Sequence, residues 1–465
     1  MLRAAAGPPF PLPIIFFAKA SMTIFLFYCG IFIAMALVES RRLSTIEDYY
    51  VAGRGASAVE TGLSVAASSV GASATIGMCG LAYQVGLPAV WWLLSGAAGL
   101  FVLSRFLLKA VRRQRALTML ELVRGRLGSE AATIAAVIIL AAWTAILAAQ
   151  FSAMGVMVEA MSGWGSAESL IFGAGFILFY TMLGGQGAVM KSDVLQFAVM
   201  AAGLAALLAA LLLGDPHPLE HLRFELLNDA FGFGDWARFM LLIGGSFVVC
   251  PMLFTRFMSA RSDRAARRGA VVGGAGLLFM AAVIVLIGIE AKALLADGTP
   301  PDKVLALAAA ELPGAMNVVF GLVMMSAILS SADSCLITAA AVATNDLLGK
   351  PGIGRSRLMM VLLSAAGLWL ASGGRGVLEL LLAANNMYVC AVVAPVFAAL
   401  SAARPLHRRR ATAAMVLSGS IALAGEFTGE VLCSYAAMGA SVVGTLLALD
   451  RKPRRAAAPK KAAKA

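Results

Sequence analysis

The chain is poor in charge, because only 13% of its 465 residues are Asp, Glu, Lys or Arg, whereas soluble domains carry about 25%. It has three histidines, and no cysteine pair has the spacing of a zinc or redox motif. P-loop, catalytic-triad and dinucleotide-binding patterns are also missing, so no motif indicates an enzyme. Hydrophobic residues make up 60% of the chain, and the mean hydropathy is +0.87. This composition excludes a soluble nucleic-acid-binding protein and indicates a membrane protein.

Apolar segments are long enough for about thirteen spans, since one helical span needs about 20 largely apolar residues. The six cysteines lie inside these segments and are expected to be small buried residues rather than ligands or disulfides: Cys29, Cys79, Cys250, Cys335, Cys390 and Cys433. The sequence therefore predicts an all-α polytopic membrane protein. The segments are 22–38, 60–83, 89–111, 130–161, 169–183, 193–213, 236–257, 269–294, 315–347, 358–371, 377–402, 412–425 and 431–449.

Basic residues are distributed unevenly between alternate loops. If the N-terminus lies outside, 30 of the 37 Lys and Arg residues face the cytoplasm, as the positive-inside rule requires. We therefore expect a multi-pass protein of the plasma (bacterial inner) membrane with a cytoplasmic C-terminus. A cleaved signal peptide is the alternative for the first segment, but Arg41 and Arg42 follow its apolar run and no cleavage-like site ends it. The basic tail, 451–465, is interpreted as a disordered tail or as a contact for anionic headgroups.

Two predicted spans contain helix-breaking residues. The second is rich in Gly, Ser and Ala around Ser68-Ser69-Val70-Gly71, which favours either close helix packing or an unwound centre whose carbonyls bind a cation. The seventh contains Ile243-Gly244-Gly245-Ser246 followed by Cys250-Pro251, and we expect a kink or break before the proline. These spans are five apart, which is typical of the first helices of two five-helix inverted repeats.

The ninth predicted span carries a dense polar cluster. Ser330 and Ser331 lie next to an intramembrane acid, Asp333, and to Ser334. Serine hydroxyls often bond to the preceding helical turn, but intramembrane carboxylates are costly and usually functional. Oxygen ligands without sulfur or imidazole suit a hard cation such as Na⁺.

Four motifs, in order along the chain, resemble those of the sodium/solute symporters, the family of the sodium-coupled proline, pantothenate, sialic acid and sugar carriers. The motifs are 47–54, 184–196, 251–262 and 326–334. The resemblance implies a leucine-transporter-type fold, with two inverted five-helix repeats preceded by one helix and followed by two. The expected division is an N-terminal part at 1–46, a symporter core at 47–402, two further helices at 403–450 and the basic tail at 451–465.

The resemblance also implies binding residues. A conserved Na⁺ site would use backbone or hydroxyl oxygens of Ala67, Val70, Ala327, Ser330 and Ser331. Some family members have a second cation site, whose positions correspond here to Asp193, Ser330, Asp333 and Ser334. An Asp replaces a hydroxyl ligand at residue 333, so this carboxylate could strengthen such a site or carry a proton instead.

The expected substrate pocket departs from the known carriers. Its positions correspond to Ser69, Gly71, Ser73, Ala74 and Cys250, and the polar residues that bind sugar hydroxyls are missing, which argues against a sugar. No Lys or Arg is expected inside the core spans, so an anionic substrate would rest on half-helix N-termini and the bound Na⁺. Further candidates, each equally explained by helix packing or interface positions, are Trp91, Trp92, Gln150, Asn385, Asn386 and Tyr388.

The function that these observations predict is Na⁺-coupled uptake of a small organic solute, with a carboxylate or an amino acid favoured. The expected partners are Na⁺ as the coupling ion, the solute and the lipid bilayer, without nucleic acid. Two alternatives remain open. One is a proton-coupled carrier of the same fold, in which Asp193 or Asp333 titrates, and the other is a transporter-like sensor that acts through a partner chain.

Overall fold

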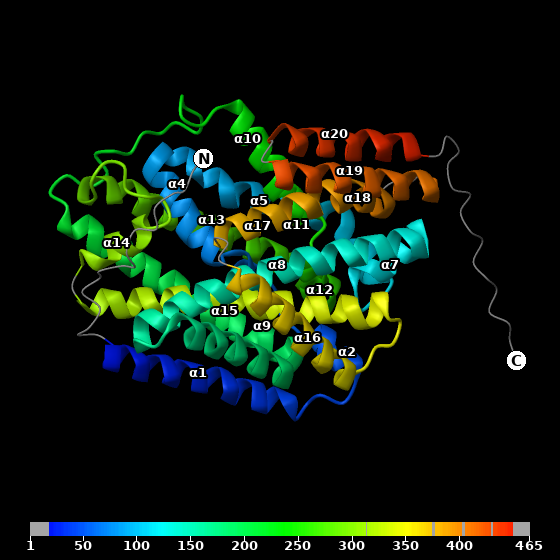
Figure 1. The fold of residues 1–465 in the computed structure, drawn as a ribbon, viewed down its shortest axis with the longest axis horizontal. Helices are drawn as coiled ribbons and strands as arrows, with labels where there is room; N and C mark the ends of the chain where they lie inside the picture. The colour runs from blue at the N-terminus through cyan, green and yellow to red at the C-terminus, as the bar shows by residue number, and fades with distance from the viewer. Residues whose placement is uncertain (1–17, 313, 374–376, 402–404, 429–430, 450–465) are drawn as a thin grey trace, which may run out of the picture.

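The computed structural model describes residues 18–312, 314–373, 377–401, 405–428 and 431–449. Within these ranges the chain is helical, and its β contacts are isolated bridges. Long helices lie side by side, with α1 (Ala18–Ser40) along one edge and α19 (Arg408–Thr428) and α20 (Val431–Ala448) along the opposite edge (Figure 1). The predicted all-α class is confirmed.

Most of the remaining helices follow one another with short connections, and a longer loop at 215–232 joins α9 to α10. They are α2 (Ile46–Val51), α3 (Ala58–Ser69), α4 (Met78–Val85), α5 (Trp91–Val102), α6 (Leu108–Arg113), α7 (Met119–Leu127), α8 (Ser129–Ser162), α9 (Ser166–Gly214), α10 (Phe233–Phe239), α11 (Gly245–Val248), α12 (Pro251–Ser259), α13 (Asp263–Leu294), α14 (Val304–Ala310), α15 (Gly314–Ala341), α16 (Ile353–Ser372), α17 (Val377–Tyr388) and α18 (Ala394–Ser401). Single turns of 3₁₀ or π helix extend or join several of them: η1 (Ala52–Arg54), η2 (Ser73–Gly77), η3 (Leu87–Val90), η4 (Leu103–Leu107), η5 (Met240–Gly244), η6 (Val342–Leu347) and η7 (Val389–Val393).

Apart from the two breaks at 70–72 and 249–250 and the last residue of 431–449, the described parts of the thirteen predicted apolar segments fall within helical elements. Eight helices in the described ranges are long and apolar enough to cross a membrane, or up to ten if each of two bent pairs is one span. Two predicted segments, 169–183 and 193–213, are merged in the 49-residue α9. The multi-pass architecture is therefore confirmed, whereas the number of spans and the four-part division of the chain stay predictions.

The first broken helix is interrupted where the sequence predicts. Helix α3 ends at Ser69, and Val70 has non-helical dihedrals (φ −104°, ψ 63°). The chain resumes in η2 and α4 at an angle of 63° to α3. Gly71 has no room for a side chain, because a Cβ there would lie 2.5 Å from Ser331 Oγ. Close approach to α15 thus explains one glycine at this break.

The second broken helix is interrupted directly before Pro251. Val249 (φ −129°, ψ 63°) and Cys250 (φ −103°, ψ 119°) leave the helical region, and Pro251 opens α12. Proline fits the first turn of a helix but removes a hydrogen bond from a helix interior. The two parts meet at 41°. The predicted break before Pro251 is confirmed.

Helix α9 bends at Gly185, whose φ of 59° lies in the left-handed region that glycine tolerates. A Cβ at this position would come within 2.9 Å of the Tyr49 carbonyl oxygen. The bend separates the two predicted spans of α9 and lets α2 pack against this helix. As a result, α9 brings Tyr180 from one side of the bend and Asp193 from the other toward α15, on which Asp333 lies.

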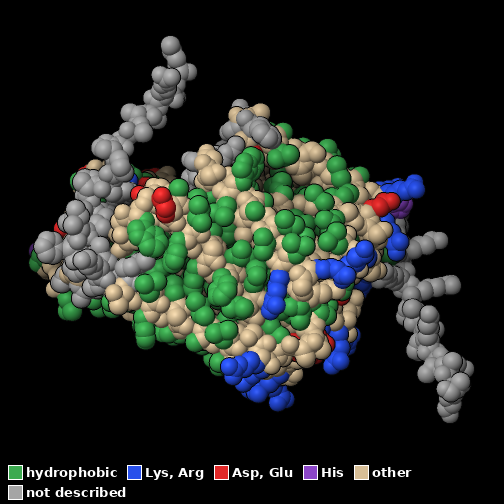
Figure 2. Space-filling view, turned by 60° about the horizontal axis from the view of Figure 1, so that its bottom comes forward, with side chains coloured by type: hydrophobic (Ala, Val, Ile, Leu, Met, Phe, Trp, Pro, Cys, Tyr) green, Lys and Arg blue, Asp and Glu red, His purple; other side chains and the backbone are tan. Residues whose placement is uncertain are grey.

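Several basic loops meet at one end of the molecule. Glu39 binds Lys191 (2.5 Å) and Arg42 (3.2 Å), while Arg112 binds Asp263 (2.6 Å). Figure 2 shows Lys and Arg side chains gathered toward the end where α2 and α7 lie in Figure 1, with hydrophobic side chains covering the flank. Loops that the charge pattern assigns to the same side therefore do lie together.

The ends of the two broken helices are joined at this charged end. The Ala56 amide donates to the Ser259 carbonyl (3.0 Å), and the Arg261 amide donates to the Ala56 carbonyl (2.8 Å), which together form an isolated parallel bridge. We call this pair of hydrogen bonds the backbone bridge. Arg54 reinforces it by donating to the carbonyl oxygens of Met258 (3.2 Å) and Arg115 (2.8 Å).

Candidate cation and solute site

Helix α15 is the most enclosed of the candidate spans. In its most apolar 18-residue window, 78% of the residues are buried inside the protein, against 22% in α16. Its hydroxyl groups at Ser330 and Ser331 consequently face other helices rather than lipid. Helices α3 and α9 both pack against it.

The predicted Na⁺ ligands are largely brought together. Ser330 Oγ donates to the carbonyl oxygens of Ala67 (3.1 Å) and Ala327 (3.2 Å), and thus links the broken helix to α15. Ser331 Oγ donates to the Ser68 carbonyl at 3.2 Å. We call these hydroxyl and carbonyl oxygens the first cation position. A cluster of hydroxyl and carbonyl oxygens offers lone pairs of the kind that a hard cation binds.

Val70 lies within the break, and its amide donates to the carbonyl oxygens of Ala66 and Ala67 (3.1 Å each). It is fully buried, but Ser331 bonds to the carbonyl of Ser68, two residues earlier. Gly71, predicted for the substrate pocket, lies against Ser331 and therefore borders the first cation position. The segment that the motifs indicate is thus the one that contacts α15, but Ser331 bonds to the Ser68 carbonyl, which the sequence analysis does not name.

A buried arginine contradicts one prediction from the sequence. Arg256 on α12 is 0% exposed, and its Nη2 lies 2.9 Å from Asp193 Oδ2 on α9, which is also 0% exposed. The expectation that no Lys or Arg lies in the core spans is therefore wrong. The charge pattern assigns Arg256 to a cytoplasmic loop, whereas α12 directs its side chain into the helix bundle. Removing one partner of such a buried pair costs about 3–5 kcal/mol, so the two residues must be considered together.

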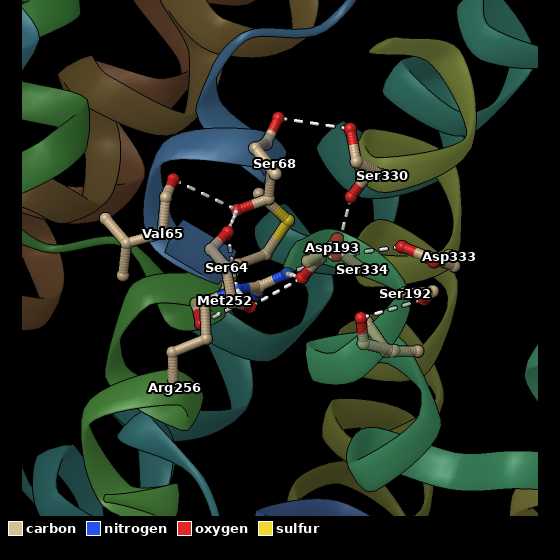
Figure 3. A network of polar contacts seen from close by, with 12 residues as sticks. Ser64, Val65, Ser68, Ser192, Asp193, Met252, Arg256, Ser330, Asp333 and Ser334 are labelled. Carbon is tan, nitrogen blue, oxygen red and sulfur yellow. Dashed lines mark hydrogen bonds and ion pairs between the residues drawn. The ribbon is translucent and has the colours of Figure 1, made fainter. Parts of the chain in front are cut away.

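The guanidinium of Arg256 has further partners around Asp193. Its Nε donates to Ser64 Oγ (2.7 Å) and to the Ser64 carbonyl (3.2 Å), while Nη2 also donates to Ser334 Oγ. Ser64 Oγ in turn donates to Asp193 Oδ2 at 2.5 Å. Figure 3 shows these side chains converging from α3, α9, α12 and α15. The sequence does not predict Arg256 and Ser64 as site residues; a signal was present, because Arg256 interrupts an apolar run.

The other intramembrane acid has hydroxyl partners. Tyr180 donates to Asp333 Oδ2, and Ser334 Oγ lies 2.9 Å from Asp333 Oδ1. Ser334 also donates to the Ser330 carbonyl (2.7 Å), which connects this acid to the first cation position. The residues predicted for a second cation, Asp193, Asp333 and Ser334, are thus gathered in one network, but Arg256 is gathered with them.

The residues predicted for the solute pocket lie around the two breaks. Cys250 is half-buried and lies next to Pro251, at the second break. Tyr388 is buried, and its hydroxyl has no hydrogen-bond partner within the described ranges. Ser69 Oγ bonds to the Val65 carbonyl (2.6 Å) within its own helix. Ser73 and Ala74 lie in η2, directly after the break.

The other candidate side chains separate into two groups. Trp91 donates to the Leu226 carbonyl (2.8 Å) and Trp92 packs on Phe239, so both hold loops or neighbouring helices. Asn386 donates to Glu426 (2.8 Å) and Ser434 (2.9 Å) on the C-terminal helix pair, while Asn385 is half-buried. Gln150 is buried and its Oε1 lacks a partner within the described part of the chain.

The six cysteines are free, and four of them are buried. Within the described residues, no group of three or more His, Cys, Asp or Glu side chains could hold a metal ion. The candidate binding groups in these residues are instead the oxygen atoms shared by α3 and α15 and the charged network next to them.

Solved structures share this fold. A Na⁺-coupled sialic acid symporter in a substrate-bound outward-open state is similar over 93% of this chain and 98% of its own, with a TM-score of 0.79 and 14% identity. A nucleobase-cation-symport-1 family transporter in a closed conformation matches with a TM-score of 0.58 and 11% identity, over 86% of this chain and 94% of its own. The chain therefore has the leucine-transporter-type fold that the motifs predict.

Sequence comparisons indicate relatives of the same kind as the motifs do. Residues 49–214 match the family model described as "Sodium:solute symporter family". The sodium/pantothenate symporter of Haemophilus influenzae is 27% identical over 70% of this chain and 70% of its own length. The sodium/glucose cotransporter of Vibrio parahaemolyticus is 26% identical over 63% of this chain, and the human sodium/iodide cotransporter is 25% identical over 69%. These matches span 59% and 53% of the two cotransporters, less than two thirds of their lengths.

The predicted resemblance is confirmed: the chain is related to the sodium:solute symporters. The family and its Na⁺-coupled members imply Na⁺ as the coupling ion, as the sequence predicts. The relatives and the fold are those of transporters rather than enzymes.

Proposed function

We propose that the protein is a secondary active transporter that couples inward Na⁺ flow to uptake of a small organic solute. The observation that carries the proposal is the contact of Ser330 and Ser331 on α15 with carbonyl oxygens of Ala67 and Ser68 on the broken helix. An ion held by such oxygens joins two elements that otherwise meet through weak neutral hydrogen bonds.

The proposed Na⁺ ligands are oxygen atoms of Ala67, Val70, Ala327, Ser330 and Ser331. Na⁺ bound there stabilises one arrangement of α3 against α15 and so organises the adjacent break, where the solute binds. Because coupling free energies are reciprocal, the solute then raises the affinity for Na⁺ by the same factor. Movement of the broken helices against α9 and α15 exposes both ligands to the other side of the membrane.

The proposed solute pocket lies around Ser69, Ser73, Ala74 and Cys250, with Gly71 at its border with the cation. The unpartnered hydroxyl of Tyr388 supports this location, since a buried polar group without a partner is costly unless a ligand or water satisfies it. Arg256 is engaged by Asp193, so an anionic solute would meet half-helix N-termini and Na⁺ instead. We therefore favour a small carboxylate or an amino acid.

The proposed location is the plasma (bacterial inner) membrane, with the N-terminus outside and the C-terminus in the cytoplasm. The supporting observation is that loops rich in Lys and Arg meet at one end of the molecule (Figure 2). Cysteine labels placed in the loops at 114–118 and 260–262 should react from the cytoplasmic side only. Reaction of either loop with an impermeant reagent in intact cells would contradict this orientation.

The central test is counterflow of radiolabelled amino acids and carboxylates into proteoliposomes, with Na⁺ or K⁺ as the cation. Ser331→Ala should raise the Na⁺ concentration for half-maximal uptake about tenfold or more, because a ligand to a charged group contributes about 1.5–3 kcal/mol. Ser418→Ala is the matched control, since its buried hydroxyl bonds, among the described residues, to Ala414 (2.7 Å) and Met415 (3.3 Å) of its own helix.

Unchanged Na⁺ activation in both Ser330→Ala and Ser331→Ala would remove the proposed Na⁺ site. Uptake that follows a pH gradient without Na⁺ would favour the proton-coupled carrier. Solute binding without transport would favour a sensor with a separate partner chain.

A further inference from the structure

A hollow lies where the outer part of the second broken helix meets the C-terminal helix pair. Its volume is about 220 Å³, and residues of α5, η5, α11, η7, α18 and α20 line it. Figure 1 shows α5, α11 and α18 next to α19 and α20. Two lining residues, Leu241 and Val442, are 49% and 43% exposed. Since α5 and α18 belong to candidate membrane spans, the hollow opens toward the lipid. We call it the apolar hollow.

Irregular helix geometry explains why side chains do not fill the apolar hollow. Two of its walls are π turns, η5 and η7, and α5 continues into a third, η4. A π turn adds a residue to a helix and so interrupts the regular packing of ridges into grooves. Gly99 still touches η5, because a Cβ there would lie 2.1 Å from the Gly244 carbonyl oxygen. A Cβ at Gly245, in contrast, would meet η7 at no less than 3.6 Å, so there is room beside it.

The lining is suited to hydrocarbon rather than to a polar solute. Ser441, which is buried, is the one residue with a polar side chain among the described residues that line the hollow. Pockets for small ligands usually measure about 300–1,000 Å³ and place several polar groups around the ligand. A smaller apolar hollow at the lipid boundary accommodates part of an acyl chain, whose methylene groups make dispersion contacts that an empty space would forfeit.

Basic side chains lie at the charged end of two of the walls. On α5, Arg105 is exposed and follows the lining residue Val102 by one turn. At the end of α20, Arg410 donates to the Leu447 carbonyl (3.3 Å), little more than one turn beyond the lining residue Val442. Because a helix rises 1.5 Å per residue, both arginines lie within about 10 Å of the hollow along the helix axes. Anionic lipid headgroups attract basic residues in such positions.

We propose that the apolar hollow binds an acyl chain of an anionic phospholipid, whose phosphate lies near Arg105 and Arg410. The bound chain contacts Gly244 and Gly245 of the second broken helix, so the position of this helix depends on the lipid beside it. Binding of a lipid here requires neither Na⁺ nor a transported solute. The inference therefore goes beyond the proposed function and does not depend on it.

The first test fills the hollow. Native mass spectrometry of the detergent-solubilised protein measures retention of phosphatidylglycerol, which is anionic, and of phosphatidylethanolamine, which is zwitterionic, with identical acyl chains. The wild-type protein should retain one phosphatidylglycerol. Ala98→Phe places a large side chain in the hollow and should weaken this binding about tenfold, as the loss of two buried methylene groups would. Ala436→Phe is the matched control, because Ala436 is exposed on α20 outside the lining, and should bind as the wild type does.

The second test removes the headgroup contacts. Arg105→Gln combined with Arg410→Gln should lower the preference for phosphatidylglycerol over phosphatidylethanolamine about tenfold, because each basic residue near anionic lipid contributes to the attraction. Arg355→Gln is the control, since Arg355 is exposed at the start of α16 and α16 does not line the hollow. Equal preference for the two lipids in the wild-type protein would overturn the assignment of an anionic lipid.

A third measurement requires no variant to fold. Phosphatidylglycerol with a photoreactive diazirine in one acyl chain should attach to peptides of α5 and α20 in the wild-type protein. Attachment that avoids both helices would overturn the proposal, and so would equal retention of lipid by Ala98→Phe and Ala436→Phe. Lipid-free dimers that Ala98→Phe dissociates would also overturn it, because a second copy of the chain would then occupy the hollow. Lipid binding as expected, without Na⁺-dependent uptake, would support this inference and contradict the proposed function.

Discussion

The two broken helices use different chemistry for similar interruptions. The first turns by 63° through Val70, Gly71 and Ala72, and it presents backbone carbonyl oxygens to α15. The second turns by 41° in front of Pro251 and sends a charged side chain, Arg256, into the bundle. One break therefore contributes main-chain dipoles, and the other contributes a full positive charge.

The largest expected effect concerns the second break, whose Arg256 side chain is buried against Asp193. Asp193→Asn leaves Arg256 buried without its carboxylate and should lower the free energy of unfolding by about 3–5 kcal/mol. Thermal unfolding in detergent measures this loss. The matched control is Asp263→Asn, because Asp263 pairs with Arg112 at 2.6 Å but is 70% exposed. An exposed pair contributes about 0–1 kcal/mol, so equal losses in the two variants would contradict a special role for the buried pair.

The next largest effect concerns the first break, which presents main-chain carbonyl oxygens to α15. Gly71→Ala would bring the new Cβ to within 2.5 Å of Ser331 Oγ, which is closer than van der Waals contact allows. Overpacking of this kind costs about 1–3 kcal/mol and should separate the break from α15, so ²²Na⁺ affinity should fall about tenfold. Gly274→Ala in α13 is the control, because its Cβ would meet nothing within 4 Å. Equal Na⁺ affinities in both variants would show that close contact at Gly71 is not required for binding.

A third prediction tests whether the second break also meets the solute. In a background that retains Cys250 and none of the other five cysteines, a bulky thiol reagent should abolish uptake and the transported solute should protect against it. Cys250→Ala should remove the sensitivity. Uptake of labelled solute before and after modification provides the measurement. Insensitivity, or modification that the solute does not slow, would place the pocket away from Cys250 without affecting the Na⁺ site.

The smallest effect lies in the segment that leads into the first broken helix. Hydrogen bonds from Thr45, and to a lesser extent from Ser44, lower the pKa of Asp48 below its usual value of 3.8. A carboxyl whose pKa is depressed in the folded state stabilises that state above its unfolded pKa, and the contribution is lost as the pH falls through the folded value. Amides at the start of α2 should therefore exchange faster near pH 3 than near pH 6, after correction for intrinsic rates. Asp48→Asn should show the faster exchange at both pH values.

Much of the architecture could be predicted because its signals are local. Apolar runs place the helices, and Gly71 and Pro251 mark the breaks through the space and hydrogen bonds that they require. The hydroxyl pair at Ser330 and Ser331 was recognisable from its motif. Arg256 was misplaced because counting basic residues by position treats every arginine near a helix end as solvated. What makes its burial tolerable is Asp193, 63 residues earlier in the chain, and no local pattern contains that contact.

Asn386 is a second residue whose role could not be predicted from local sequence. Its amide within an apolar span suggested a place in the solute pocket, but it binds Glu426 and Ser434 of the C-terminal helix pair. Composition alone cannot tell a polar side chain that faces a ligand from one that joins two helices. The Tyr388 hydroxyl, which lacks a partner in the described part of the chain, is the better candidate, and this distinction required the three-dimensional structure.

The backbone bridge between Ala56 and the residues around Ala260 has a consequence for mutational scanning. Both of its hydrogen bonds come from peptide groups, the Ala56 amide to Ser259 and the Arg261 amide to Ala56. An alanine scan would leave both hydrogen bonds in place, because neither uses a side chain, and it would not change residue 56, which is already alanine. Proline lacks the amide donor, so a proline introduced at residue 56 or 261 would remove one hydrogen bond of the backbone bridge. Such variants would show the contribution of the bridge, which alanine variants do not test.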